Sequence, residues 1–228
     1  MLAVLARTFV RTLYWVNGLF PGAKSLVPKS LHRFVLLRIV GVNEGYEEML
    51  RQNPERLFLQ NELFPWVRDN YRQVLFVGTA SYTHQYEFFF RDRPDDYTTI
   101  DRNPSVKVWG SKHHIVAPIG EIAQHRPPEF FDCIILNGVL GYSIPSLDDI
   151  GVVGTDDIAA LMRTLRSVLK PGGLLVVGWN TNDMPVSAYD QGLVSPAFSR
   201  FEGTPWGPRR EFAGDPHVVE FYARDRGK

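Results

Sequence analysis

The sequence has little cysteine and no net charge, and each shortage excludes a class of protein. Cys133 is the single cysteine among 228 residues, so no disulfide can form within the chain. No CxxC pair and no histidine cluster has the spacing of metal ligands, and we expect no metal site. The 25 basic and 25 acidic residues cancel. This balance argues against nucleic acid as a partner, because binding to phosphates normally requires a positive field.

The sequence also lacks an apolar run long enough to cross a membrane. Near its start, Leu5, Phe9 and Leu13 share one stripe of a predicted helix, with Arg7 and Arg11 on another side. The helix is short and interrupted by arginine, and no convincing signal-peptide cleavage site follows it, so we expect a cytoplasmic protein. We favour a helix that packs on the protein core or roofs the active site. The alternatives are a membrane-surface helix and a homodimer contact.

The most informative segment, residues 73–101, reads QVLFVGTASYTHQYEFFFRDRPDDYTTID. Residues 74–77 form a continuous apolar run, which is typical of a parallel strand covered on both faces. Gly78 follows at the point where the chain must turn sharply. Thr79 or Ser81 is expected to cap the helix that comes next.

Asp101 ends a second predicted strand, residues 97–100, and lies 23 residues after Gly78. A carboxylate at this place can accept hydrogen bonds from both hydroxyls of a ribose, and nucleotide-binding folds put an acid about 20 residues after the glycine turn. The alternative is that Asp101 only caps the turn at Asn103 and Pro104. Together, the strand, glycine turn, helix, second strand and acid predict a nucleotide-binding βαβ unit.

Strands and helices continue to alternate further along the chain. The apolar patterns predict strands at residues 113–117, 131–136 and 174–179 and a helix at residues 155–169. The helix has its own start and stop signals, since Thr155 can cap it and the sequence Lys-Pro-Gly-Gly follows it. Such alternation predicts an α/β fold with a doubly wound, parallel sheet.

Four segments, VLFVG, TTID, FDCIILNGVLGY and LRSVLKPGGLLVVGWN, resemble in order and spacing the strand motifs of class I S-adenosylmethionine-dependent methyltransferases. The resemblance covers residues 71–179, and residues 217–224 look like the last strand of that family, which inserts antiparallel beside an earlier strand. It implies a doubly wound, mostly parallel seven-stranded sheet in residues 71–228. Residues 1–70 would form an N-terminal helical extension, which in this family commonly closes over the substrate.

The sequence departs from the family pattern around the glycine turn. Phe76 stands where the family usually has an acid, and Ala80 and Tyr82 stand where second and third glycines would be. Residues 117–119 replace the acid that often holds the adenine amino group, so adenine would rest on apolar surface and main-chain groups. Because Gly-x-Gly-x-x-Gly is absent as well, an NAD-dependent oxidoreductase is disfavoured.

The resemblance implies that S-adenosyl-L-methionine is the cofactor and that it binds at the carboxyl ends of the strands. The cofactor-binding residues expected there are Gly78, Thr79, Ala80, Ser81, Asp101, Arg102, Ile119 and Asn137.

Three residues are candidates for catalysis. His84 is the candidate general base because the ordinary histidine pKa is near neutrality, whereas a lone histidine on a helix is more often structural. Asn137 ends the fourth expected strand, where it either orients a polar substrate or caps the strand end. Tyr142 either contacts the substrate or packs within its loop.

The resemblance implies a methyltransferase that acts on the oxygen or nitrogen of a small polar molecule. Two alternatives stay open. One is an enzyme with the same fold and a different reaction. The other is a non-catalytic protein whose N-terminal helix docks on a partner or a membrane.

Overall fold

The computed structural model describes residues 28, 30–31, 52–140, 155–182, 186–187, 189–192, 194 and 198–226, without the side chains of residues 155–157. Contacts divide the chain into Met1–Gln52 and Asn53–Lys228, and the sheet lies in the second unit. The helix expected at the start of the chain and the candidate Tyr142 lie outside the described residues. The domains at residues 1–70 and 71–228 stay a prediction, and the contact division comes earlier in the chain.

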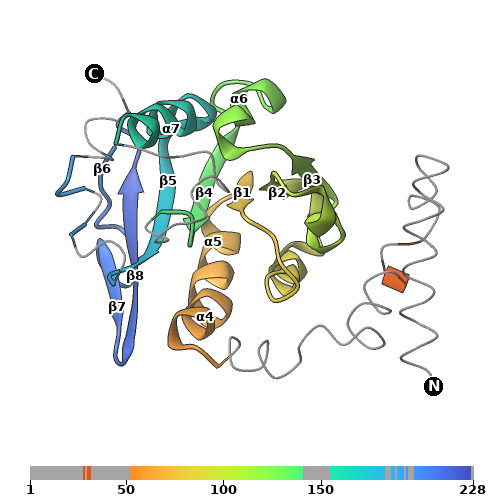
Figure 1. The fold of residues 1–228 in the computed structure, drawn as a ribbon, viewed down its shortest axis with the longest axis horizontal. Helices are drawn as coiled ribbons and strands as arrows, with labels where there is room; N and C mark the ends of the chain where they lie inside the picture. The colour runs from red at the N-terminus through yellow and green to blue at the C-terminus, as the bar shows by residue number, and fades with distance from the viewer. Residues whose placement is uncertain are drawn as a thin grey trace. The chain divides into compact units, whose positions relative to one another are not determined.

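The second unit is built on a sheet of eight strands, seven of them in the order β3-β2-β1-β4-β5-β8-β6 (Figure 1). Strands β1 to β5 are parallel, β8 runs antiparallel between β5 and β6, and β7 pairs with β8 beside this path. The strands are β1 (Val74–Val77), β2 (Tyr97–Asp101), β3 (His113–Val116), β4 (Phe131–Asn137), β5 (Leu169–Asn180), β6 (Ser199–Arg200), β7 (Arg209–Phe212) and β8 (Asp215–Ala223). The doubly wound, mostly parallel sheet and its antiparallel last strand are confirmed, with β7 as one strand more than expected.

The central strands are apolar because both of their faces are covered. β1 and β4 pair in register from Val74 with Cys133 to Val77 with Leu136, and all four β1 residues are buried. Alternate residues point to opposite faces of a sheet, so these strands supply two separate hydrophobic clusters. Cys133 is a fully buried free thiol in one of them.

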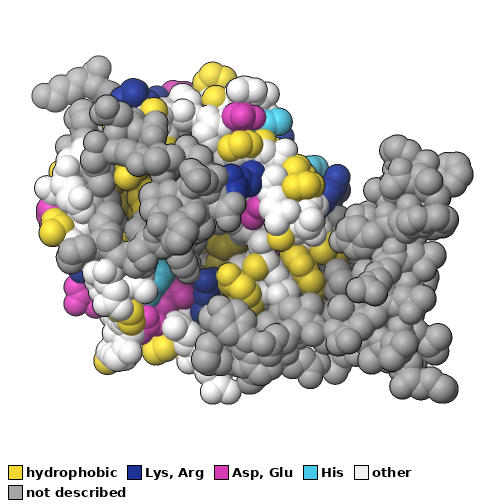
Figure 2. Space-filling view, viewed as in Figure 1, with side chains coloured by type: hydrophobic (Ala, Val, Ile, Leu, Met, Phe, Trp, Pro, Cys, Tyr) yellow, Lys and Arg dark blue, Asp and Glu magenta, His cyan; other side chains and the backbone are white. Residues whose placement is uncertain are grey.

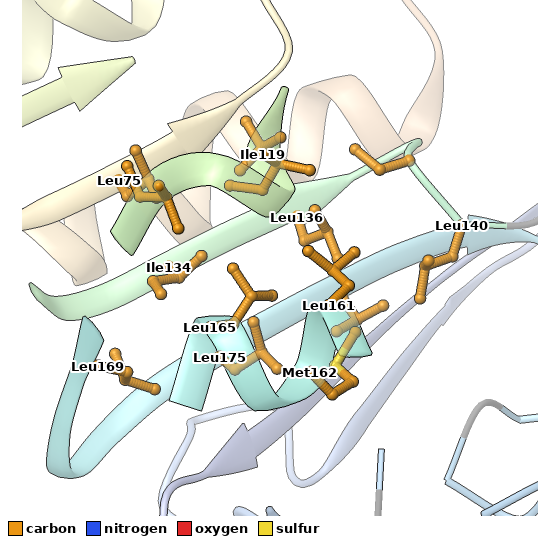
Figure 3. Packing of buried hydrophobic residues seen from close by; sticks show 14 of the residues in the cluster. Leu75, Ile119, Ile134, Leu136, Leu140, Leu161, Met162, Leu165, Leu169 and Leu175 are labelled. Atoms are coloured by element: carbon orange, nitrogen blue, oxygen red, sulfur yellow. The ribbon is translucent and has the colours of Figure 1, made fainter. Parts of the chain in front are cut away.

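Helix α7 (Thr155–Val168) and the short helix α6 (Ile122–His125) cover one face of the sheet. Figure 3 shows side chains of α7 lying against those of β4 and β5. Full burial of a leucine contributes roughly 1.5–3 kcal/mol, so this interface supplies a large share of the stability. The cluster includes Leu75, Ile119, Ile134, Leu136, Leu140, Leu161, Met162, Leu165, Leu169 and Leu175.

Helix α7 ends within one residue of the position that the Lys-Pro-Gly-Gly sequence predicts. The helix stops at Val168, where residue 169 was expected. Gly172 then takes a positive φ of 77°, a conformation that favours glycine. Its N–H donates to the Arg224 carbonyl at 2.8 Å, which joins the first part of β5 to the segment after β8.

The opposite face is covered by α4 (Pro54–Phe58), η2 (Leu59–Leu63) and α5 (Phe64–Asn70), which follow one another without a break. Asn53 caps the start by accepting a 2.9 Å hydrogen bond from the Glu55 N–H. The middle element is π-helical, and the Phe64 N–H bonds the Leu59 carbonyl. This wide turn comes directly before Pro65, which lacks an N–H and would crowd an ordinary helical turn.

The helix expected after Gly78 is a 3₁₀ helix, η3 (His84–Phe90), and it begins later than expected. Thr79 and Ser81 do not cap it. Thr83 precedes the helix, and its hydroxyl accepts a bond from the Ala80 N–H at 2.9 Å. Aromatic residues are weak helix formers, and here they serve packing, since Tyr86 stacks on Phe64 with ring centroids 4.3 Å apart.

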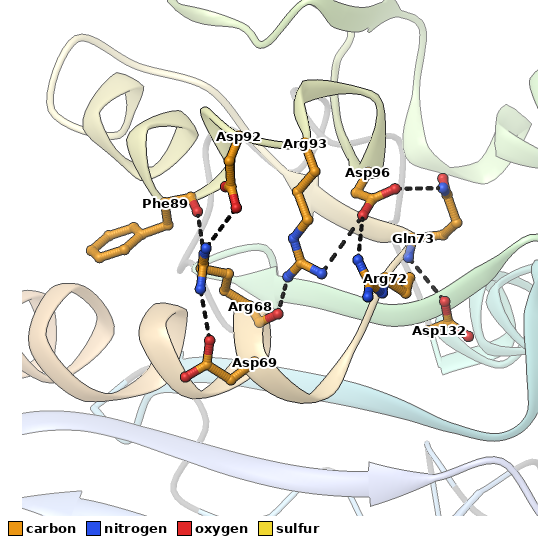
Figure 4. Close-up of polar contacts among 9 residues, drawn as sticks. All are labelled: Arg68, Asp69, Arg72, Gln73, Phe89, Asp92, Arg93, Asp96 and Asp132. Atoms are coloured by element: carbon orange, nitrogen blue, oxygen red, sulfur yellow. Dashed lines mark hydrogen bonds and ion pairs between the residues drawn. The ribbon is translucent and has the colours of Figure 1, made fainter.

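Arginine and aspartate side chains fasten α5 to η3 and to the segment that leads from η3 to β2 (Figure 4). Arg68 bonds the Phe89 carbonyl at 3.0 Å and Asp92 at 2.7 Å. Arg93 reaches back to the Arg68 carbonyl and lies 3.6 Å from Asp96. These contacts are far from the carboxyl ends of the strands and hold the scaffold together.

No helix in the described part of the chain combines the length and the apolar character that crossing a membrane requires.

Candidate functional site

A cavity lies at the carboxyl ends of β1, β2 and β3, where the sequence places the nucleotide side of the site. Gly78 has a positive φ of 86°, and its N–H donates to the Ile100 carbonyl at 2.9 Å, so the chain turns away from β1 close to β2. A side chain on Gly78 would project into open space. The residues that line the cavity are Val77, Gly78, Ile100, Asp101, Arg102, Ala117, Pro118, Ile119 and Val139.

The carboxylate of Asp101 holds the glycine turn in place. One oxygen, Oδ2, accepts the Thr79 N–H at 2.8 Å, and the other, Oδ1, accepts the Asn103 N–H at 2.8 Å. A carboxylate offers about four acceptor positions, so two are left for further donors. Asp101 therefore caps the turn at Asn103 and still can accept the hydroxyls of a ribose.

Three features of the turn and the cavity fit S-adenosylmethionine. Thr79 is 7% exposed, and its Oγ1 atom is buried without a hydrogen-bond partner in the described structure. A buried polar atom without a partner costs free energy unless a ligand or water bonds it. Beside Gly78 there is open space for a ligand, and the apolar walls of Ala117, Pro118 and Ile119 suit a flat base.

Of the eight expected cofactor residues, four line this cavity and four do not. Gly78, Asp101, Arg102 and Ile119 line it. Thr79, Ala80 and Ser81 belong to the adjoining turn, and the Ala80 N–H is already bonded to Thr83. Asn137 faces a different group of side chains, described below.

His84 is not among the cavity residues. Its ring lies 5.6 Å from that of Trp109 and 5.9 Å from that of Phe88, and its Nδ1 atom contacts the Ser81 carbonyl. This environment packs the ring and occupies one of its nitrogen atoms. The role of His84 as a general base stays a prediction.

Asn137 belongs to a largely buried polar group near the cavity residue Val139, which we call the Glu55 cluster: Glu55 and Arg56 of α4, Asn137 of β4 and His217 of β8. Asn137 donates through Nδ2 to Glu55 Oε1 at 2.7 Å, and its Oδ1 atom lies 3.2 Å from His217 Nε2. Glu55 is 3% exposed and Asn137 9%. Figure 2 shows acidic, basic and histidine side chains together over the region of α4 and β8.

Gly178 of β5 provides the space that the cluster needs. Asn137 and Gly178 pair across β4 and β5, and the Gly138 N–H donates to the Gly178 carbonyl at 2.9 Å. A Cβ atom on Gly178 would lie 1.8 Å from Asn137 Oδ1 and 3.0 Å from His217 Nε2. Any larger residue would therefore displace the amide that joins Glu55 to His217.

Arg56 connects the cluster to the glycine turn. Its Nε atom lies 3.1 Å from Glu55 Oε2, and its guanidinium lies over the Tyr82 ring, 4.9 Å from the centroid. Glu55 thus keeps a cationic partner in a buried place, as a buried charge requires. Tyr82, which stands where the family has a glycine, packs against α4.

The charges in the cluster act on the imidazole of His217. Burial lowers the pKa of His217 below its ordinary value, Glu55 raises it, and Arg56 lowers it. Burial is the largest of these effects, so the ring is neutral at pH 7. A neutral ring of this kind can accept a proton.

Sequence reasoning missed Glu55, Arg56 and His217. Glu55 and Arg56 precede the segment that resembles the family, and His217 lies near the start of the last strand, whose likeness to the family assigned no role to any of its residues. The available signal was the position of His217 at the start of the last strand, because that strand runs antiparallel and begins where the parallel strands end.

No group of three or more histidine, cysteine, aspartate or glutamate side chains in the described part of the chain could hold a metal ion.

No protein-family model and no curated protein matches the sequence. Solved structures do match. The N-methyltransferase NodS from Bradyrhizobium japonicum is similar with a TM-score of 0.53 at 16% identity, over 77% of this chain and 99% of that one. Its complex with S-adenosyl-L-homocysteine has a TM-score of 0.52 at 18% identity, over 77% of this chain and 90% of that one. A SAM-dependent methyltransferase from Archaeoglobus fulgidus has a TM-score of 0.52 at 10% identity, over 80% of this chain and 100% of that one. The chain therefore has the class I methyltransferase fold.

Proposed function

We propose that this protein is an S-adenosylmethionine-dependent methyltransferase that acts on the oxygen or nitrogen of a small polar molecule. The observation that carries the proposal is Asp101 at the end of β2, beside the open turn at Gly78 and within the cavity. This is the combination of acid and turn that binds a ribose in nucleotide-binding sheets.

The residues of the cavity have separate roles in binding the cofactor. Asp101 accepts hydrogen bonds from the ribose, Ile119 and Ala117 provide apolar surface for adenine, and Thr79 Oγ1 offers a polar atom that lacks a partner. When bound, S-adenosylmethionine supplies an electrophilic methyl group on a sulfonium. The protein aligns the acceptor with that methyl group and excludes water.

The Glu55 cluster near the cavity supports a small molecule as the methyl acceptor. Val139 lines the cavity, and Asn137 of the Glu55 cluster lies two residues earlier at the end of the same strand. The cluster offers hydrogen-bonding atoms in a largely buried place, which suits a few polar groups of a small molecule. NodS, which has a similar fold, is an N-methyltransferase, and nitrogen is one of the two acceptor atoms proposed here.

A protein of the same fold with another reaction, or with none, is the second candidate. Phe76 favours it, because a buried phenylalanine, 2% exposed and with its ring centroid 5.7 Å from that of Phe64, stands where the family usually has an acid. Tyr82 favours it too, since an aromatic ring stands in place of a glycine.

Calorimetric titration with S-adenosyl-L-homocysteine, the demethylated form of the cofactor, tests the proposal. We expect binding to the wild type and at least roughly tenfold weaker binding to Asp101→Ala, because one charge-assisted hydrogen bond is worth about 1.5–3 kcal/mol. Asp95→Ala is the matched control, since Asp95 is an exposed acid paired with Lys112 and His113. Thermal melts of all three proteins check folding.

Absence of binding to the wild type would contradict the proposed cofactor. Equal affinity of Asp101→Ala and wild type would mean that Asp101 serves only the turn at Thr79 and Asn103.

A further inference from the structure

We propose that His217 is the general base of the methyl acceptor site, that it takes the proton of an acceptor hydroxyl, and that Asn137 and Glu55 are its positioning residues. The inference rests on the proposed function and narrows its substrate class to small molecules with a hydroxyl acceptor.

The hydrogen bonds of the Glu55 cluster fix which nitrogen of His217 is free. An ionised carboxylate only accepts hydrogen bonds, so Glu55 Oε1 requires the NH₂ group of Asn137, at 2.7 Å. The Asn137 carbonyl oxygen is then turned toward His217 Nε2 at 3.2 Å and must accept a hydrogen bond from its N–H. The ring consequently carries its hydrogen on Nε2 and its lone pair on Nδ1.

Nδ1 is available to a ligand. Among the described residues no hydrogen bond to this atom is found, and the His217 side chain is 13% exposed. The ring is therefore held from one side by Asn137 and keeps its other nitrogen free. A general base held in this way by a fixed third group has the arrangement that activates nucleophiles in enzymes.

The charges around His217 stabilise its protonated form when that form is needed. Glu55 Oε1 lies 3.9 Å from Nε2, and Asp215 on the same strand adds negative charge, whereas Arg56 of α4 opposes both. Burial keeps the resting ring neutral. The imidazolium that forms on proton uptake lies next to a buried carboxylate.

Space for the ring and the amide is built into β5. Gly178 lies opposite Asn137, and a Cβ atom there would overlap Asn137 Oδ1. A cluster that only fastened α4 to the sheet would not need a ring nitrogen that has no hydrogen-bond partner among the described residues.

The reaction needs a base for one class of acceptor. In O-methylation the acceptor oxygen forms a bond to the methyl carbon, the bond from carbon to sulfur breaks, and the sulfonium becomes a neutral thioether. The hydroxyl proton moves to His217 Nδ1 and then to water. A neutral amine attacks through its own lone pair and does not need its proton removed first, so a positioned base indicates a hydroxyl acceptor.

Transfer of label from S-adenosylmethionine carrying a radioactive methyl group tests the base. The acceptor probe is the small-molecule fraction of a cell extract, and the product is analysed for a methyl–oxygen bond. His217→Gln keeps a donor for Asn137 and removes the titrating ring, and it should transfer roughly 10²–10⁴-fold less label, the usual contribution of a general base. His125→Gln, on the exposed side of α6, is the matched control.

A second variant separates positioning from simple structural support. Glu55→Gln keeps an oxygen for Asn137 and removes the charge that raises the pKa of His217. The rate of methyl transfer falls on the acid side of its pH profile, where the base becomes protonated, and in Glu55→Gln this fall should move to lower pH. A structural role alone would lower the rate at every pH and leave the pH of this fall unchanged. That result would overturn the role of Glu55.

Different experimental outcomes would overturn this inference and the proposed function. Wild-type rates retained in His217→Gln, or label found only on nitrogen, would overturn the inference and leave a methyltransferase. No transfer and no cofactor binding in the wild type would overturn both. NMR of the wild type with ¹⁵N-labelled histidine gives a check that needs no variant, because a hydrogen on Nδ1 of neutral His217 would exclude the proposed base.

Discussion

Asn137 at the end of β4 donates a 2.7 Å hydrogen bond to Glu55 in α4, although 82 positions separate them in the sequence. Both side chains are buried, so the bond joins the helical segment before the sheet to the carboxyl ends of its strands. The methyltransferase resemblance assigned residues 1–70 a covering role without naming any residue. This bond identifies Glu55 as a residue of that segment that reaches the candidate site.

Replacing Glu55 by alanine should destabilise the protein by about 1–3 kcal/mol, because the Asn137 amide would lose its acceptor in a buried place. Glu211→Ala is a suitable control. Glu211 pairs with Arg209 at an exposed site, and such a pair contributes about 0–1 kcal/mol. Urea unfolding of the two variants gives the comparison, and equal losses would show that burial of the Glu55 cluster does not matter.

Two glycines with similar positive φ angles allow a test of the cofactor cavity. Gly78 and Gly214 have φ values of 86° and 77°, and at both a Cβ atom would meet nothing within 4 Å. Alanine at either position should cost about 1–2 kcal/mol through backbone strain. Gly78→Ala should also weaken the binding of S-adenosyl-L-homocysteine, since the methyl group of the new alanine enters the cavity. Gly214→Ala, in the turn between β7 and β8, should bind this ligand as the wild type does.

Thermal melts and calorimetry on the same samples measure both effects. If Gly78→Ala lost stability but bound the ligand normally, the glycine turn would not contact the cofactor.

The fold was predictable because its information is local. The apolar runs at β1 and β4, the glycine turn at Gly78 and the stop after α7 each follow from a few neighbouring residues. Their alternation then determines a parallel sheet. The 3₁₀ conformation of η3 was not predictable in this way, because Tyr86 and Phe90 stack on aromatic residues of other elements, Phe64 of α5 and Tyr97 of β2.

The candidate site was predictable only in part. Gly78, Asp101 and Ile119 were found because strand ends meet at one edge of a parallel sheet. Glu55 and His217 were missed because their proximity to Asn137 depends on how α4 and β8 pack against the sheet. No spacing in the sequence encodes that contact.

The apolar layer under α7 should be sensitive to loss of volume. Leu165 is 0% exposed within the cluster shown in Figure 3, so Leu165→Ala should lower the free energy of unfolding by about 2–5 kcal/mol. Leu57 of α4 is 42% exposed, and Leu57→Ala should cost far less. Denaturant unfolding measures the difference, and similar losses at both positions would contradict the described packing of α7.

The lowered pKa of His217 also predicts how stability depends on pH. Since burial depresses the pKa in the folded state, the unfolded chain binds this proton first as the pH falls below the ordinary value of about 6.5. His217 therefore makes the free energy of unfolding decrease between about pH 6.5 and its lower folded pKa. Glu55, Arg56 and Asp215 are the charged groups that set this folded value.

His217→Gln should remove that part of the acid dependence, so its stability should fall less steeply than that of wild type across this range. His125→Gln removes a histidine from the exposed side of α6 and should keep the wild-type slope. Urea unfolding at a series of pH values gives the three slopes. A wild-type slope in His217→Gln would mean that His217 binds protons equally in the folded and unfolded states, and the neutral buried ring on which the proposed base depends would then be wrong.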